Sequence, residues 1–462
     1  MDIQPVILWT DALIYLLLLL AAGTVWHTMR HEHLLEPWKR VARSRTGQAA
    51  MVVLSCYAVV GLLDTLHFNP KSGEDERGRP VFSTEVLSLF DHLAGSLRTQ
   101  REKTYSAPFA VHLFSKETIE QAAGGSVRDY PRLLHGGAHL GPESRGRGVD
   151  ILIRGVSGAV KGVVVWSLLV TLLCRFDRRR LTRLLAGRMD KPWHVGAWTA
   201  LAISMLFGAC WEWAGYYHIL GTDKVGEDVF FQSLKSIRTG LVIGTLTTLV
   251  MLPAAILLGI MAGYFRGWID DVIQYLYTTL NSIPGVLLIA AAVLMMQIYM
   301  SNHADDFNSL TERADLRLLF LCLILGVTSW TGLCRLLRGE ALKLRELEYV
   351  QAARGFGVGH YRILIRHVLP NVMHIVLISI ALDFSGLVLA EAVLSYINIG
   401  VDPSTNSWGN MINSARLELA REPVVWWSLL AAFGFMFTLV LAANLFSDVV
   451  RDAFDPRLRQ QR

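Results

Sequence analysis

Three acidic residues within or beside long apolar runs are the first candidates for chemistry. Glu212, Asp383 and Glu391 each stand among apolar neighbours, and ionisable groups inside a membrane mark substrate or ion pathways by default. Asp383 and Glu391 are therefore candidates for lining a translocation pathway. For Asp383 a structural hydrogen bond is an equal alternative, and for Glu391 a packing or gating role is favoured. Glu212 lies between Trp211 and Trp213, which is typical of an anchor at the membrane interface.

The sequence holds no combination of residues typical of an enzyme or a metal site. It lacks the GxxxxGK[ST] pattern, so this chain is not expected to hydrolyse ATP by a phosphate-binding loop. No nucleophile stands with a base and an orienting group. His31, Glu32 and His33, and the pair His135 and His139, suggest a metal site, but neither set has enough suitable ligands nearby. We predict no catalysis, no metal and no cofactor bound by this chain.

A polar loop between two apolar runs is a further candidate. Residues 340–355 favour a helix with Leu344, Leu347 and Val350 on one narrow apolar face. Three closely spaced glycines then break the helix, and a second one, HYRILIRHV, leads to Pro370. An isolated amphipathic helix suits insertion into the groove of a partner. An ordinary solvated loop helix explains the same pattern equally well.

The elements that must position these residues are membrane spans. The 462-residue chain is 52% hydrophobic and 18% charged, with a mean hydropathy of +0.38, outside the usual range for a soluble protein. Nine runs approach the ~20 residues needed to cross a ~30 Å hydrocarbon core. They centre on 6–26, 49–68, 155–174, 196–219, 238–263, 279–300, 316–337, 373–397 and 426–447. We predict an all-α polytopic membrane protein, in which Lys161 of the third run extends toward one face.

The distribution of Lys and Arg predicts the orientation. Residues 27–48, 175–192, 338–371 and the C-terminal tail are rich in Lys and Arg, whereas 301–315 and 400–424 are neutral or acidic. Because basic loops stay in the cytoplasm, the N-terminus is expected outside and the C-terminus inside. The formal net charge of +5 therefore reflects topology, and no nucleic-acid partner is expected.

A long polar stretch, residues 69–150, follows the second expected span. Because successive spans cross the membrane in opposite directions, this stretch is expected on the extracytoplasmic side. It carries a helical pattern between residues 81 and 135, in VFSTEVLSLFDHLAGSL and SKETIEQAA. A small folded cap and a disordered loop are equal alternatives for it.

The segment Glu348–Asn371, EYVQAARGFGVGHYRILIRHVLPN, closely resembles the EAA loop of the permease subunits of binding-protein-dependent ABC importers. In that family the loop is a coupling helix that docks into the nucleotide-binding subunit. The resemblance implies that role here for Glu348, Ala352, Ala353, Arg354 and Gly357.

Other segments resemble the C-type subunit of the dipeptide/oligopeptide/nickel branch. They are LGTDKVGEDVF at Leu220–Phe230, EAVLSYINIG at Glu391–Gly400, DPSTNSWGNM at Asp402–Met411 and the tail FSDVVRDAFDPRLR. Four residues depart from the family pattern: Glu227 stands where Arg is usual, Asn398 where Gly is usual, and Tyr275 and Thr278 where Arg and Asp are usual.

The resemblance implies a type I ABC importer permease core of six transmembrane helices in residues 193–462, with the coupling loop at 340–371. About three extra N-terminal helices precede this core. Residues 1–68 are expected to hold two of them, 69–150 an extracytoplasmic insert, and 151–192 the third with a basic linker. We identify no counterpart in the family for this N-terminal part.

The implied protein is a subunit of the bacterial inner membrane. It pairs with a second permease subunit and is surrounded by membrane lipid. Its other partners are two ATPases, which use the ATP, and an extracytoplasmic solute-binding protein. The expected cargo is peptide-like solutes, nickel or other small solutes. One alternative is an ion-coupled secondary transporter, which calls for internal repeats and midplane carboxylates. Others are a permease core fused to an N-terminal sensor module, and a scaffold that has lost transport.

Overall fold

The structure, a computed structural model, describes residues 3–74, 80–83, 85–120, 126–141, 146–188, 191–303 and 309–454. Nine helices among these residues are long and apolar enough to cross a membrane. They are α1 Trp9–Arg30, α3 Arg45–Asp64, α6 Arg147–Leu173, α8 Trp193–Ala214, α9 Val229–Phe265, α11 Gly285–Asn302, α12 Leu310–Arg345, the helical run His360–Tyr396 and α17 Trp427–Phe454. Each contains most of one expected span, so the all-α polytopic fold is confirmed.

Shorter elements connect these helices. The helices are α2 Glu32–Val41, α4 Leu89–Leu93, α5 Gly95–Thr99, α7 Arg178–Leu185, α10 Trp268–Ser282, α13 Glu348–Gly355 and α16 Trp408–Glu418. The run His360–Tyr396 consists of α14 His360–Ile363, a π-helical turn Leu364–Val368 and α15 Leu369–Tyr396. The strands are β1 Ile3–Val6, β2 His67–Glu74, β3 Pro80–Phe82, β4 Leu87–Ser88, β5 Glu117–Glu120 and β6 Ser126–Asp129.

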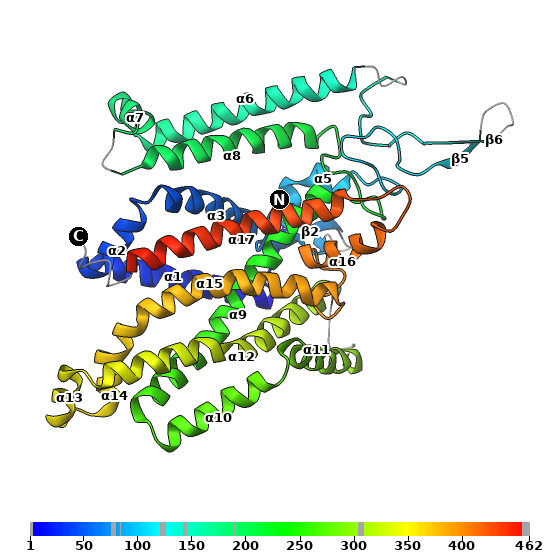
Figure 1. The fold of residues 1–462 in the computed structure, drawn as a ribbon. Coiled ribbons are helices and arrows are strands. Elements are labelled where there is room, and N and C mark those ends of the chain that lie inside the picture. The colour runs from blue at the N-terminus through cyan, green and yellow to red at the C-terminus, as the bar shows by residue number, and fades with distance from the viewer. Residues whose placement is uncertain are drawn as a thin grey trace. The chain divides into compact units, whose positions relative to one another are not determined.

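The chain divides by its internal contacts into two compact units. Unit 1 comprises Met1–Val6, Ala42–Thr239 and Asn406–Ala442, and unit 2 comprises Ile7–Val41, Gly240–Thr405 and Ala443–Arg462. Helices α9 and α17 (Figure 1) belong in part to each unit. The sequence-based boundaries at residues 68, 150 and 192 stay predictions, because the units group contacts rather than consecutive residues.

Glycines allow α6 and α8 of unit 1 to pack closely side by side (Figure 1). A Cβ on Gly158 would lie 2.8 Å from the Cα of Ala209, and one on Gly162 would lie 2.8 Å from the carbonyl carbon of Ser204. Small residues of this kind let helix backbones approach in a membrane, where van der Waals packing replaces the hydrophobic driving force.

Lys161 lies on α6 in the middle of the expected third span. Its ammonium extends to Glu212 near the end of α8, with 2.5 Å between Nζ and Oε2. The expected extension of Lys161 toward one face therefore ends in an ion pair with Glu212, which reduces the cost of placing either charge in an apolar helix pair.

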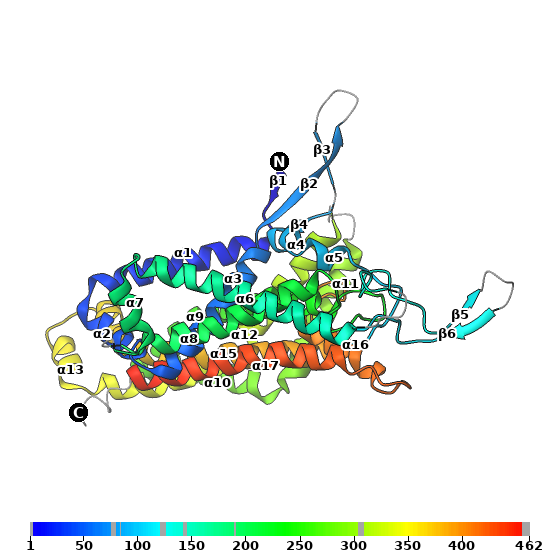
Figure 2. The ribbon, with the colours of Figure 1, turned by 90° about the horizontal axis from the view of Figure 1, so that it is seen from above.

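The described residues of the 69–150 insert are folded. β1, β2 and β3 form an antiparallel sheet that β4 joins at β2, while β5 and β6 form a separate hairpin (Figure 2). The helical expectation for SKETIEQAA is wrong over Glu117–Glu120, which form strand β5 and pair with β6. Ser115 and Lys116 are not helical either, and residues 121–123 lie outside the described residues. Among the described residues between 81 and 135, the helical expectation is met only by the short helices α4 and α5. Cross-strand pairing has overridden local helix propensity here.

Unit 2 is built around α9, α12 and α15. Gly259 of α9 lies so close to α12 that an added Cβ would be 2.7 Å from the carbonyl oxygen of Cys334. The extra helix α1 also packs on α12, where the backbone N–H of Thr10 donates to Asp315 across 3.1 Å. Below them a buried cluster from α9, α12 and α15 supports the loop that carries the expected coupling residues.

Candidate functional site

The candidate coupling segment begins on α12, which continues past its apolar span to Arg345. The expected single helix over 340–355 is therefore wrong, because a two-residue turn separates α12 from α13. A straight helix would place Leu344, Leu347 and Val350 along a line of ~9 Å. The turn instead buries Leu344 and Val350 in one core and leaves Leu347 exposed.

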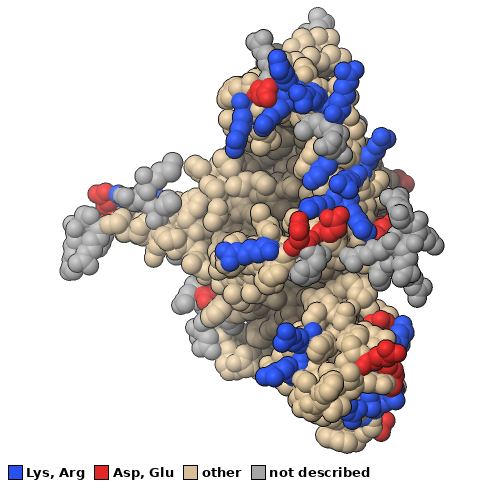
Figure 3. Space-filling view, turned by 90° about the vertical axis from the view of Figure 1, so that its left-hand side faces the viewer, with Lys and Arg blue, Asp and Glu red and all other residues tan. Residues whose placement is uncertain are grey.

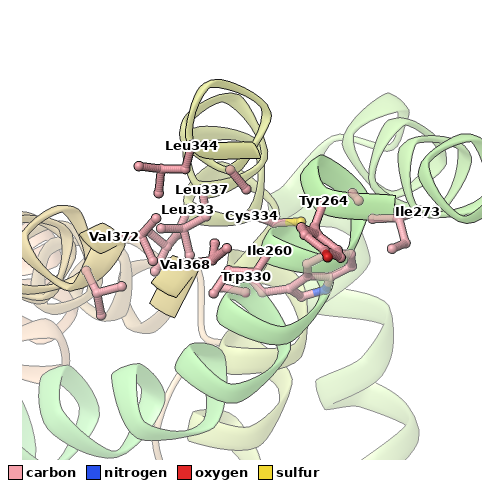
Figure 4. Close-up of a cluster of buried hydrophobic side chains, with 14 of the residues drawn as sticks. Ile260, Tyr264, Ile273, Trp330, Leu333, Cys334, Leu337, Leu344, Val368 and Val372 are labelled. Atoms are coloured by element: carbon pink, nitrogen blue, oxygen red, sulfur yellow. The ribbon is translucent and has the colours of Figure 1, made fainter. Parts of the chain in front are cut away.

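Buried side chains hold α13 and α14 on the core of unit 2. Val350 of α13 and Ile363 of α14 are 1% and 0% exposed, and they join a cluster that includes Tyr264 of α9 and Leu337 of α12. Figure 4 shows Tyr264 and Leu337 within this cluster. The Tyr264 hydroxyl also lies 2.9 Å from Nδ1 of His360. Because a packed core deforms little, α13 is held firmly on the helices that share this cluster.

The same segment also has exposed apolar side chains. Phe356 is 88% exposed and Tyr361 is 77% exposed. Exposed apolar residues that gather outside the lipid-facing helices mark a site of interaction. We define the coupling surface as the exposed side chains of Leu347, Tyr349, Phe356, Tyr361 and Ile365.

The five residues implied by the resemblance all lie on α13 or the turn that follows it. Glu348 and Arg354 are exposed in the first and last turns of α13, where their charges complement the helix dipole. Ala352 is exposed, whereas Ala353 is half-buried against the core cluster. Gly357 has φ of +74° and open space around its Cα, so backbone conformation rather than crowding favours glycine there.

The two candidate pathway residues lie about two turns apart on α15. Asp383 is half-buried. Glu391 is only 2% exposed and accepts a hydrogen bond of 2.7 Å from the hydroxyl of Ser395. Just beyond α15, Asn398 has φ of +62°, a conformation that Gly and Asn tolerate best, which explains the departure from Gly at this position.

Two of the histidines considered for metal binding, His31 and His139, make other contacts. Nε2 of His139 lies 2.8 Å from a carboxylate oxygen of Asp150, and Nδ1 of His31 lies 2.9 Å from the carbonyl oxygen of His27. The side chain of His33 lies outside the described residues. In the described part of the chain, no group of three or more potential ligands is assembled for a metal ion.

A buried ionic cluster in unit 1 joins the insert to the segment LGTDKVGEDVF. We call Glu102, His218 and Asp228 the Glu102 clasp. Nδ1 of His218 lies 2.7 Å from Asp228 and Nε2 lies 3.4 Å from Glu102, and all three side chains are at most 2% exposed. The Glu102 carboxylate also accepts three backbone N–H groups, from residues 134, 135 and 136, at 2.8 to 3.1 Å. The insert and this segment of the core are therefore joined by a fully satisfied buried network.

The network shifts the pKa values of Glu102 and His218. Burial by itself would raise the pKa of Glu102, but the hydrogen bonds from His218 and from three backbone N–H groups lower it to about 2. Burial likewise opposes protonation of His218, but its contacts with Asp228 and Glu102 raise the pKa to about 9. The clasp thus holds an imidazolium between two carboxylates at neutral pH.

A second ionic cluster ties the insert and α3 to the start of α9. We call it the Lys235 cluster. Nζ of Lys235 lies 2.6 Å from a carboxylate oxygen of Asp91 in α4 and 3.9 Å from Asp64 at the end of α3. Ser88 donates to Asp64 across 2.6 Å and also caps α4. Three segments far apart in sequence are thus joined by buried charge pairs within unit 1.

Sequence reasoning missed both clusters because no regular spacing connects their members. One signal was present: Glu227, which departs from the usual Arg, lies 2.6 Å from Arg101 of the insert. The acidic residue therefore complements a basic residue of a segment for which we had identified no counterpart. Nothing in the structure explains the departures at Tyr275 and Thr278, which are exposed on α10.

Comparison with known proteins decides the family. Residues 255–460 match the family described as binding-protein-dependent transport system inner membrane component. The glutathione transport system permease protein GsiD of Pectobacterium atrosepticum is 32% identical over 244 residues, which are 52% of this chain and 73% of that protein. The oligopeptide transport system permease protein OppC of Mycobacterium tuberculosis is 31% identical over 256 residues, 55% of this chain and 81% of that protein. This chain belongs to that permease family.

Other relatives agree with this membership. A putative peptide permease protein of Brucella suis is 32% identical over 242 residues, 52% of this chain and 73% of that protein. The permease is the inner-membrane component of an ABC importer of the peptide family, as the EAA-like segment and the other family-like segments together predicted. The ion-coupled transporter and sensor-fusion alternatives are not favoured. Membership implies ATPase and solute-binding protein partners and a multi-pass place in the inner membrane.

The Glu102 clasp makes a prediction about pH. Because the folded pKa of His218 is raised from 6.5 to about 9, its contribution to stability is fully present below pH 6.5 and is lost as the pH rises through about 9. Glu102, lowered from 4.5 to about 2, contributes above pH 4.5 and loses its contribution as the pH falls toward 2. Melting temperatures of the purified permease are therefore expected to fall between pH 6.5 and 9, and less steeply in His218→Gln. A His112→Gln variant at an exposed site is the control, and equal slopes in all three proteins would contradict the prediction.

Proposed function

We propose that the permease docks a cytoplasmic ATPase through the coupling surface. The observation that carries this is the combination of exposed Phe356 and Tyr361 with buried Val350 and Ile363 on the same short segment. A partner bound to the exposed side chains displaces α13 and α14. The core cluster joins these two helices to α9, α12 and α15, which therefore move with them. Glu348, Ala352, Ala353, Arg354 and Gly357 are the proposed coupling residues. Ala352 and Arg354 contact the partner, and Gly357 allows the turn between the two helices.

The complete importer comprises this permease, a second permease subunit of the same family, two ATP-binding-cassette ATPases and an extracytoplasmic solute-binding protein. ATP binding closes the ATPases and displaces the coupling segments, which opens the pathway toward the binding protein. ATP is used by the partner subunits, and this chain carries out no catalysis and binds no cofactor. Its role is to convert the motion of the ATPases into access for the solute.

The solute is peptide-like. This proposal is supported by two relatives, which are named as permease proteins of a glutathione transport system and an oligopeptide transport system. Asp383 is proposed to face the pathway because it is a half-buried carboxylate within α15. Glu391, buried and bonded to Ser395, supports the end of that helix rather than the solute.

The N-terminus lies on the extracytoplasmic side of the inner membrane and the C-terminus in the cytoplasm. In support, β1 at the start of the chain pairs with β2 directly after α3, so both segments lie on one side of the membrane. Figure 3 shows Lys and Arg gathered at the end of unit 1 that carries α7, as expected for a cytoplasmic end.

Cysteine labelling tests this orientation. Ser115→Cys in the insert and Lys343→Cys at the end of α12 both introduce an exposed thiol. A membrane-impermeant maleimide is expected to label the first in cells with a permeable outer envelope and an intact inner membrane, and the second only after that membrane is opened. The unmodified chain, whose native cysteines are buried or half-buried, gives the background. The reverse pattern would overturn the orientation.

A further inference from the structure

The segment between α6 and α8 concentrates positive charge. Residues 175–192 contain seven Lys or Arg and two Asp, a local net charge of +5 that equals the formal net charge of the whole chain. Figure 3 shows this concentration over α7. This short segment is therefore strongly basic.

The backbone brings α7 close to the end of a lipid-facing helix. Leu172 and Leu173 at the end of α6 are 60% and 80% exposed, so the apolar surface of α6 extends to its last residue. Arg175 and Phe176 then adopt positive φ values of 52° and 59°, which turn the chain sharply. Asp177 next caps α7 by accepting from the backbone N–H of Arg179 across 2.9 Å. Helix α7 thus begins within a few residues of the apolar surface.

The faces of α7 differ in the way an interfacial helix requires. Leu181, Leu184 and Leu185 recur at helical spacing and are half-buried, whereas Arg179 and Arg183 are exposed on the other face. Aromatic side chains stand at both ends of the segment, with Phe176 73% exposed and Trp193 46% exposed. Aromatic residues at this depth are typical of the boundary between lipid tails and headgroups.

The arginines of this segment have few acidic partners. Arg180 pairs with Asp177 at 3.3 Å. Among the residues that the structure describes, no acidic group lies within ion-pair distance of Arg175, Arg179, Arg183 or Arg188. The membrane beside α6 and α8 offers phosphate groups, which complement unpaired guanidinium groups in charge and in hydrogen-bonding geometry.

We propose that α7 and its flanking arginines, residues 175–188, form a binding surface for anionic phospholipid headgroups in the leaflet at this end of α6 and α8. The leucines of α7 lie toward the acyl boundary, and the arginines hold the phosphates. A basic amphipathic segment next to a membrane span gains affinity from each Lys or Arg near an anionic surface. The surface holds the helix pair at a fixed depth in the bilayer.

The test compares lipid retention by two variants of the full-length chain with the same loss of charge. One carries Arg→Gln at residues 175, 179, 183 and 188. The control carries Lys103→Gln, Lys116→Gln, Arg128→Gln and Lys224→Gln, at positions in the insert and in LGTDKVGEDVF. Each protein is purified in detergent with an equal mixture of phosphatidylglycerol and phosphatidylcholine, and bound lipids are counted by mass spectrometry.

The original chain and the control are expected to retain phosphatidylglycerol in preference to phosphatidylcholine, and the arginine variant is expected to lose that preference several-fold. Added salt should weaken the preference of the original chain, and added inorganic phosphate should not displace the lipid. An unchanged preference in the arginine variant would overturn the proposal. So would a loss of co-purified ATPase with lipid binding intact, because the arginines would then contact a protein partner. The lipid readout does not depend on transport, so it is separate from the coupling proposal.

Discussion

Replacing Ala352 with glutamate is expected to lower ATP-driven uptake by about tenfold or more while the permease stays folded in the membrane. Ala352 is exposed on α13, so the new carboxylate is solvated in the isolated chain. Against a docked ATPase it would be buried without a partner, which costs several kcal/mol. Uptake into right-side-out or reconstituted vesicles with ATP enclosed, measured beside ATP hydrolysis, reports the loss of coupling.

Two further variants sharpen this test. Ala420→Glu makes the same change at an exposed site after α16 and is expected to leave uptake unchanged. Gly357→Val meets no steric obstacle but must adopt φ of +74°, which costs roughly 1–2 kcal/mol in the turn, so a partial loss is expected. Full uptake by Ala352→Glu would contradict the proposed contact between α13 and the ATPase.

Replacing Glu102 with alanine is expected to destabilise unit 1 by about 3–5 kcal/mol, because the change leaves buried charge and three buried N–H groups without their acceptor. The side chain is 1% exposed, and its partner His218 is 2% exposed, so water cannot replace the lost carboxylate. The expected result is a lower melting temperature and less monodisperse protein after purification.

The matched control is Glu117→Ala. Glu117 pairs with Lys103 across 2.6 Å, but the lysine side chain is 68% exposed, and exposed pairs contribute about 0–1 kcal/mol. Glu102→Gln keeps the shape of the side chain and one acceptor oxygen. Its loss of stability is expected to lie between those of Glu102→Ala and Glu117→Ala. If Glu102→Ala and Glu117→Ala have the same melting temperature, the Glu102 clasp does not join the insert to the core.

The sequence predicted the spans and the coupling residues for different reasons. Hydropathy summed over a span is a one-dimensional signal that does not need tertiary contacts, so even α6 with Lys161 was found. The coupling role of the residues of α13 is proposed because EYVQAARG resembles a known motif, and it stays a prediction. The turn that separates α12 from α13 was not predicted. It arises because Leu344 and Val350 are both buried in one core cluster, and no local sequence pattern specifies that shared burial.

The contacts of the insert were beyond the reach of sequence reasoning. His218 and Glu102 are 116 positions apart, and a buried ion pair between distant loops leaves no periodic pattern. Strand β5 is set by pairing with β6, whereas Glu, Lys and Ala residues nearby favour a helix when read alone. Glu227 was the one sequence signal of these contacts, because it is acidic where the family usually has Arg.

Affinity purification of the tagged full-length permease from its own membrane, in mild detergent with the bound proteins identified by mass spectrometry, tests the coupling proposal most directly. The permease is expected to bring an ATP-binding-cassette ATPase and a second permease subunit with it. The Ala352→Glu variant is expected to keep the second permease and lose the ATPase. Recovery of no ATPase with the original chain, or of equal amounts with both proteins, would contradict docking through the coupling surface.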